Sequence, residues 1–124
     1  MIASVTDLDK TEAEIYLRIL IYLANIDNEF HYREKEFIKD QAQLLQADPT
    51  EYFNNPDMEC NFLSSCGLSK NACEIIIRDC ILLSLCDGHF SQIEEITIRK
   101  IALLLSMKDS KFSKIKQWVF SLEM

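Results

Sequence analysis

Glycine and proline are scarce in this sequence, with only two of each among 124 residues. All-β sandwiches and glycine-rich nucleotide-binding loops need more turn residues than that. Long uncharged apolar stretches are also missing, because Arg18, Arg78 with Asp79, and Lys100 interrupt the most apolar segments, whereas a membrane span needs about 20 apolar residues. The first residues lack the basic segment and apolar run of a secretory signal. We therefore expect a soluble protein of the cytoplasm.

Catalytic motifs are missing as well. The chain contains no G-x-S-x-G motif, no phosphate-binding loop and no H-E-x-x-H motif, so we do not expect an enzyme. Its cysteines form no C-x-x-C pair, the usual clip of a zinc site. Their gaps of 6, 7, 7 and 6 residues place them near one another on helical faces, so we interpret them as core thiols in a reducing compartment, with a redox or metal role as the alternative. The five are Cys60, Cys66, Cys73, Cys80 and Cys86.

Basic charge is in short supply: 20 acidic residues oppose 13 basic ones, which gives a net charge of −7. A nucleic-acid partner usually requires a basic face, so this class is not expected, and neither is peripheral membrane contact. The charge is uneven, because residues 1–60 hold 13 acids and 5 bases whereas residues 61–124 hold 7 and 8. The acidic half either attracts cations or a basic protein partner, or forms a well-solvated surface.

Helical periodicity is what the sequence does contain. Apolar residues recur at spacings of three and four, and no long stretch alternates with period two. We predict one all-α domain covering residues 1–124, with six to seven helices. Thr11 with Glu14 forms the predicted capping box of the first helix, and Ser91 with Glu94 that of a later one. The expected helices cover about 11–25, 32–46, 49–54, 56–65, 69–86, 91–107 and 109–122.

An internal repeat appears when the chain is shifted by 60 residues. Residues 15–45 and 75–105 then match at 11 of 31 positions without a gap. We predict two pseudo-symmetric helix–turn–helix repeats built around two buried apolar helices, at about 15–26 and 72–86. The matches include the polar and aromatic pairs Arg18/Arg78, Asp27/Asp87, Phe30/Phe90 and Glu34/Glu94.

Each repeat carries the same acidic residues at its interhelical turn. An aspartate ends the first helix and a glutamate opens the second, so a short turn should bring the two carboxylates near each other. In a purely structural interpretation, the carboxylates cap helix ends and neutralise the arginine of each apolar helix. The four carboxylates are Asp27, Glu34, Asp87 and Glu94.

The alternative interpretation of these turns is a divalent-cation site. Carboxylates and turn carbonyls are the oxygen ligands that Ca²⁺, Mg²⁺ and Mn²⁺ prefer, and a histidine would add a nitrogen ligand for a transition metal such as Zn²⁺. The motif is not an EF-hand, because the glutamate follows the aspartate by seven residues. The candidate metal ligands are Asp27, Glu34, Asp87, Glu94, His31 and His89.

The same turns resemble those of the TerB-like family, which is named for bacterial tellurite-resistance operons. The resemblance rests on Leu-Ala-Asn-Ile-Asp-Asn-Glu-Phe at residues 23–30 followed by Glu34. It rests equally on Leu-Cys-Asp-Gly-His-Phe-Ser at residues 85–91 followed by Glu94. The family's recurrent element is a helix ending in Asp-Gly and a glutamate that opens the next helix, and Asn28 departs from it.

Membership of that family implies an all-helical fold with two-fold pseudosymmetry, acidic clusters proposed to bind metal ions, and no enzymatic activity. It also implies a link to stress responses, to membrane-associated complexes or to a co-chaperone. Two functions follow as hypotheses. The chain is either a metal-binding stress-response domain or a protein-interaction or co-chaperone-type scaffold whose acidic turn residues are purely structural.

The last predicted helix carries one apolar stripe, formed by Phe112, Ile115, Val119 and Leu122, with Trp118 beside it. This helix either closes the core or, with lysines on its other faces, presents a basic amphipathic surface to a membrane surface or a partner. The candidate residues of that interaction surface are Phe112, Trp118, Lys111 and Lys114.

Overall fold

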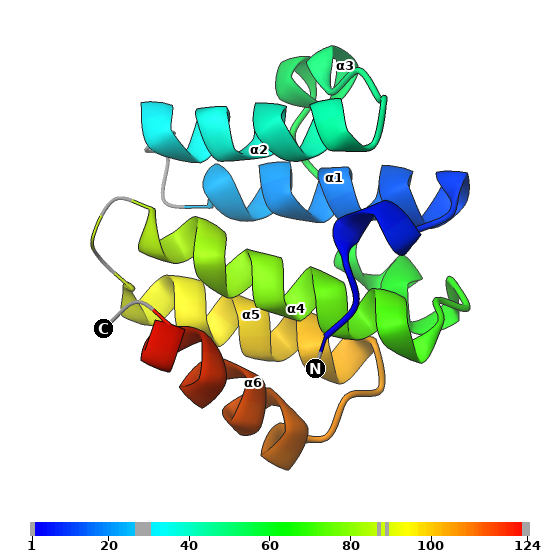
Figure 1. Cartoon of the computed structure of the whole chain (residues 1–124). Helices are drawn as coiled ribbons and strands as arrows, with labels where there is room; N and C mark the ends of the chain where they lie inside the picture. Colours follow the sequence, from blue (N-terminus) through cyan, green and yellow to red (C-terminus); the bar gives the residue numbers. More distant parts are fainter. Residues whose placement is uncertain (1, 27–30, 87, 89, 123–124) are drawn as a thin grey trace.

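The computed structural model describes residues 2–26, 31–86, 88 and 90–122, and all regular secondary structure in those ranges is helical (Figure 1). The predicted all-α class is therefore confirmed. No helix within these ranges is long and apolar enough to cross a membrane. In chain order the described elements are η1 (Val5–Asp7), α1 (Lys10–Ala24), α2 (Tyr32–Leu44), α3 (Thr50–Asn54), η2 (Cys60–Ser65), α4 (Lys70–Leu85), α5 (Gln92–Leu104) and α6 (Asp109–Leu122), where η marks a short 3-10 helix.

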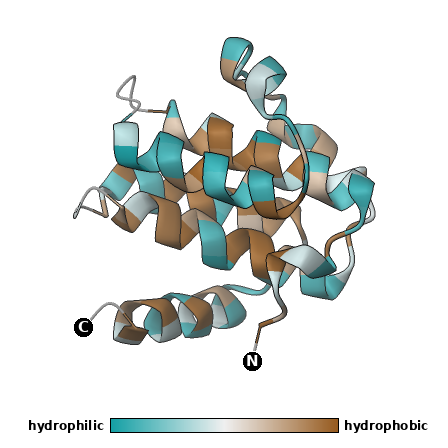
Figure 2. Cartoon of the chain, turned by 45° about the horizontal axis from the view of Figure 1, so that its top comes forward, coloured by the Kyte–Doolittle hydropathy of each residue, from teal (hydrophilic) through white to brown (hydrophobic). Residues whose placement is uncertain are grey.

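Helices α1 and α4 lie side by side at the centre of the molecule. Helix α2 packs against α1 on one side, whereas α5 and α6 pack against α4 on the other (Figure 1). The side chains of residues 15–17 and 75–77 are at most 9% exposed, because a helix that is apolar on almost every side is stable only when other elements surround it. The outer helices instead show alternating hydrophobic and hydrophilic faces (Figure 2).

The helices recur at the offset that the sequence repeat predicts. Helices α2 and α5 begin and end 60 positions apart, and α1 and α4 begin 60 positions apart. The turns that end α2 and α5 also contain equivalent hydrogen bonds. The N–H of Ala47 donates to the carbonyl of Ala42, and the N–H of Met107 donates to that of Ala102, each at 2.9 Å. These local features agree with the repeat, whereas a two-fold axis between the halves stays a prediction.

The first helix is capped two residues earlier than predicted. Glu12 N–H donates to Asp9 Oδ1 at 2.8 Å, and Asp9 N–H donates to Glu12 Oε1 at 3.2 Å. The predicted capping box of Thr11 and Glu14 is therefore wrong. Asp caps a helix at least as well as Thr, and a start at Asp9 adds backbone hydrogen bonds that a start at Thr11 would forgo.

The segment after α3 is also less helical than predicted. The helix expected from Pro56 begins only at Cys60, as the 3-10 helix η2. Residues 56–59 carry the chain from α3 to the core, where Leu63 is 2% exposed. Burial of Leu63 thus fixes where the helical turn forms.

Helix α6 closes the core with one face. Phe112, Ile115 and Val119 are buried, which confirms the core-closing interpretation for these three residues. The predicted stripe is wrong at Leu122, which lies in the last turn and is 60% exposed. Trp118 beside the stripe is 40% exposed, so its indole reaches solvent.

The five cysteines are all free thiols. Cys73 and Cys80 are buried, and the other three are half-buried. Burial raises the pKa of the Cys80 thiol, so this group stays protonated at neutral pH. The prediction of core thiols is thus confirmed for the two cysteines on the inner face of α4.

Two residues just beyond helix ends generate a stability prediction. Gln46 and Ser106 have φ of 54° and 64°, in the left-handed region where a side chain is strained. Gln46→Gly and Ser106→Gly should each raise the free energy of unfolding by about 0.5–1 kcal/mol, as measured by urea denaturation. Leu45→Gly is the control, because φ of Leu45 is −85°; it should destabilise. A loss of stability in both glycine variants would contradict the prediction.

Candidate functional site

Only part of each predicted acidic turn is described. Asp27, Asp87 and His89 lie outside the described residues. Glu34 and Glu94 lie within them, at the starts of α2 and α5, and they are 4% and 5% exposed. The structure therefore describes the helix starts that follow the two turns.

Both glutamates close the starts of their helices. In α2, Glu34 Oε1 accepts the N–H of His31 at 3.3 Å, and Nδ1 of His31 accepts the N–H of Arg33 at 3.2 Å. In α5, Glu94 Oε1 accepts the N–H of Ser91 at 3.0 Å, and Ser91 Oγ accepts the N–H of Glu94 at 3.2 Å. The predicted capping box of Ser91 and Glu94 is confirmed, and His31 with Glu34 does the same.

The structure does not bring the predicted metal ligands together in the part of the chain that it describes. No group of three or more His, Cys, Asp or Glu side chains in those ranges could hold a metal ion. Three of the six candidates, His31, Glu34 and Glu94, serve as helix caps. The metal-ligand assignment stays a prediction, because its other three members lie outside the described ranges.

Among the described residues, the arginines of the two apolar helices contact other groups than Glu94, and the predicted pairing with Asp27 or Asp87 lies outside those residues. Arg78 forms an ion pair with its neighbour Asp79, with Nε 2.8 Å from Oδ1, and its Nη1 donates to the carbonyl of Ala3 at 2.8 Å. The guanidinium of Arg18 lies over the ring of Phe62, 5.4 Å from its centroid. Arg78 stands seven residues before the end of α4, roughly 10 Å along its axis, whereas Glu94 lies beyond that end.

A buried polar pair that the sequence pattern does not predict joins α1 to α4. The hydroxyl of Tyr16 donates to Oδ2 of Asp79 at 2.6 Å. Burial and the nearby carboxylate raise the pKa of Tyr16, so its hydroxyl remains a donor at all physiological pH values. Asp79 and Arg78 are visible in the sequence as charges within an apolar run. The repeat matches Arg78 with Arg18, but it does not point to Tyr16 or Asp79, because isoleucine stands at the equivalent positions 76 and 19.

The outward face of α5 is the clearest exposed apolar surface among the described helices. Ile93, Ile96 and Leu103 are 47%, 59% and 74% exposed. Together with Lys100, they follow the 3-4-3 spacing of a helix–helix seam. We call these four residues the α5 stripe. The sequence pattern does not predict this surface, because helical apolar spacing is the same for a buried face and for an exposed one.

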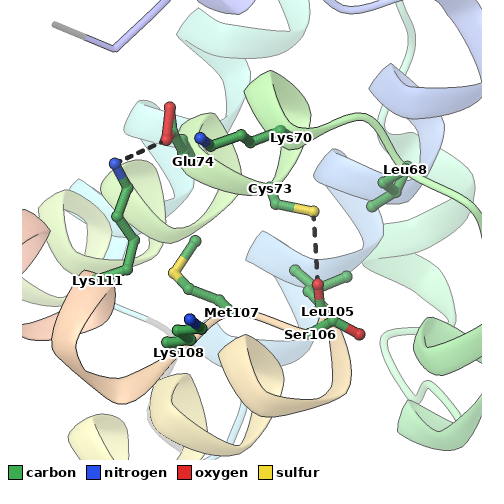
Figure 3. A pocket seen from close by; sticks show the side chains of 9 residues that line it. All are labelled: Leu68, Lys70, Cys73, Glu74, Leu105, Ser106, Met107, Lys108 and Lys111. Carbon is green, nitrogen blue, oxygen red and sulfur yellow. Dashed lines mark hydrogen bonds and ion pairs between the residues drawn. The ribbon is translucent and has the colours of Figure 1, made fainter.

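A cavity of about 510 Å³ opens at the start of α4 (Figure 3). Its lining comes from α4, from the segment that links α5 to α6, and from the first turns of α6. Lys111 Nζ lies 3.0 Å from Glu74 Oε2, and the thiol of Cys73 donates to the carbonyl of Leu105 with Sγ 3.9 Å from the oxygen. Burial raises the pKa of this thiol, so the cavity wall carries no thiolate at neutral pH.

The residues predicted as an interaction surface on α6 do not form one surface. Phe112 is buried in the core, and Lys111 pairs with Glu74 across the cavity. Trp118 is half-exposed, and Lys114 is exposed. Of the four candidates, Trp118 and Lys114 thus face solvent.

Comparison of this chain with protein-family models, with curated proteins and with solved structures found no match.

Proposed function

We propose that this chain is a non-enzymatic, TerB-like helical module that works by holding another protein. The observation that carries this proposal is the α5 stripe, an apolar helix face that the rest of the described molecule leaves uncovered. In this proposal the glutamates at the turns are structural, because each already caps a helix. A co-chaperone-type scaffold or a stress-response adaptor is the class of protein that fits.

The other half of the chain provides an internal comparison for the stripe. At the positions 60 residues earlier, helix α2 carries Arg33, Glu36, Asp40 and Gln43, and all four are exposed. The two helices have the same length and the same caps, so folding alone does not demand an apolar outward face. Exposing three aliphatic side chains costs solubility and contributes nothing to the core. We therefore assign the stripe to binding.

The chemistry of the stripe favours an amphipathic helix of a partner protein as its occupant. Its spacing presents rows of side chains that fit the grooves of another helix. Lys100 interrupts the apolar row, and none of the ion pairs that the structure shows between described residues includes it. A partner helix that offers an acidic residue at this point would neutralise the lysine. A second copy of this chain would offer a lysine in a parallel arrangement.

A pair of synthetic amphipathic peptides tests this proposal. The two 18-residue peptides carry the same apolar seam and differ in one residue opposite Lys100, glutamate in one and lysine in the other. In fluorescence anisotropy the glutamate peptide should bind at least about tenfold more tightly, or about 1.4 kcal/mol. Leu103→Asp should weaken its binding by a similar factor, because the aspartate loses its water at the contact.

The matched control is Gln43→Asp, which places the same residue at the equivalent point of α2 and should leave binding unchanged. Equal binding of both peptides, equal loss in both variants, or no binding to either peptide would contradict the proposal. Sedimentation of the protein without peptide tests whether the protein associates with itself. A dimer that Leu103→Asp dissociates would assign the stripe to a second copy instead.

A second candidate function is binding of a divalent cation at the turns. It is favoured by one observation: the Glu94 carboxylate is buried and forms no ion pair with a described lysine or arginine. A cation held with Asp87 would compensate that charge. Ca²⁺, Mg²⁺, Mn²⁺ and Zn²⁺ are the ions to test, and His31 or His89 would take part with a transition metal.

Calorimetric titration of chelator-treated protein separates the two candidates. Under cation binding, one of the four ions gives saturable heat and adds about 2.7 kcal/mol of stability at 100 times its dissociation constant. Glu94→Gln, which keeps an oxygen for the cap, abolishes both effects. Without cation binding, all four ions are silent, and Glu94→Gln changes stability equally with and without them.

A further inference from the structure

The cavity at the start of α4 exists twice in this chain. A second cavity, of about 560 Å³, opens at the start of α1, between that helix and the segment after α2. Each of the nine residues that line the α4 cavity has its counterpart, 60 positions earlier, in the lining of the α1 cavity. The two cavities are therefore the same feature of the backbone. The α1 cavity lies between the start of α1 and the left-handed turn after α2, and the α4 cavity lies between the start of α4 and the left-handed turn after α5.

The charge of the two cavities is opposite. The rim residues Asp48 and Glu51 of the α1 cavity correspond to Lys108 and Lys111 of the α4 cavity. The other two charged residues are alike, because Lys70 and Glu74 of the α4 cavity correspond to Lys10 and Glu14 of the α1 cavity. The α4 cavity thus has three lysines against one carboxylate, in a chain whose net charge is −7.

Two of these lysines are available to a ligand. Lys111 is held by Glu74, but Lys70 and Lys108 are exposed and form no ion pair with a described residue. Two other carboxylates near the rim are engaged. Glu12 accepts the N–H and hydroxyl of Ser69, and Asp109 pairs with Arg99. Positive charge therefore prevails at the mouth of the α4 cavity.

The inner wall of the same cavity is apolar. Leu68, Leu105 and Met107 line it, and the neutral thiol of Cys73 adds to this surface (Figure 3). Met107 stands where the α1 cavity has Ala47, so the apolar side chain at this position is larger in the basic copy. Its volume lies within the range of roughly 300–1,000 Å³ that small-molecule sites occupy.

We infer that the α4 cavity binds a small amphipathic anion: an anionic head group at Lys70 and Lys108, and an aliphatic chain against the apolar wall. Lysine ammonium groups bind such a head group as point charges, and the wall supplies the apolar contact. This site is independent of the α5 stripe, which lies on the outward face of another helix.

Decanoate is the probe that tests the site, with decyltrimethylammonium as a cation of equal chain length. In isothermal titration calorimetry below the micellar range, decanoate should bind one saturable site in the full chain. The cation should not displace it. Lys108→Asp, which restores the residue of the acidic copy, should weaken decanoate binding at least about tenfold, because attraction at the rim becomes repulsion.

The variant is expected to fold. Lys108 immediately precedes α6, and its carbonyl accepts the N–H groups of Lys111 and Phe112, whatever the side chain. Asp is a favoured residue at such a position, so the melting temperature should not fall. Lys39→Asp, the same exchange at an exposed position of α2, is the matched control and should bind decanoate as the parent does.

Three results would overturn the inference. One is no saturable heat with decanoate. Another is equal affinity in Lys108→Asp and Lys39→Asp. The last is competition by the cation, which would mean that the aliphatic chain of the probe, and not the charge of its head group, governs binding.

Discussion

The hydrogen bond from Tyr16 to Asp79 is the interaction on which the arrangement of the two halves depends. Both side chains lie in the core, where an uncompensated carboxylate costs several kcal/mol. Tyr16 and Arg78 compensate it, and Arg78 also donates to the carbonyl of Ala3. One carboxylate thereby ties α1, α4 and the N-terminal segment together. The equivalent positions 60 residues away hold isoleucines, Ile76 and Ile19. These two positions therefore cannot form a second bond of this kind.

Equivalent helices of the two halves, which begin 60 positions apart, carry different surfaces. The α2 and α5 helices share their length and capping, yet the outward face of α5 is apolar where that of α2 is charged. The paired cavities differ in the same way, with lysines in one where the other has acids. The inner faces and the N-terminal capping boxes of α2 and α5 are alike, whereas their outer faces differ. Both proposed binding surfaces lie in the second half of the chain.

Much of the fold could be predicted from the sequence, because its signals are local. The spacing of apolar residues predicted the helices. The matched glutamates of the two turns, Glu34 and Glu94, correctly predicted the caps of α2 and α5. The error at the cap of the first helix is a local one, a choice between neighbouring capping residues, but two other errors have long-range causes. Arg78 pairs with its neighbour Asp79, whereas Glu94, the described carboxylate of the turn, lies beyond the end of α4, and η2 forms where Leu63 meets the core. The cavity at α4 escaped notice because the matched pairs Lys10/Lys70 and Glu14/Glu74 precede the compared segment.

A double-mutant cycle on Tyr16 and Asp79 tests most directly whether this bond joins the halves. The free energy of unfolding would be measured by urea denaturation for the parent, Tyr16→Phe, Asp79→Ala and the double variant. Because the two groups share one buried hydrogen bond, the cycle should give a coupling energy of about 1–3 kcal/mol. Additive effects, to within about 0.5 kcal/mol, would contradict the account and leave apolar packing alone to hold α1 against α4.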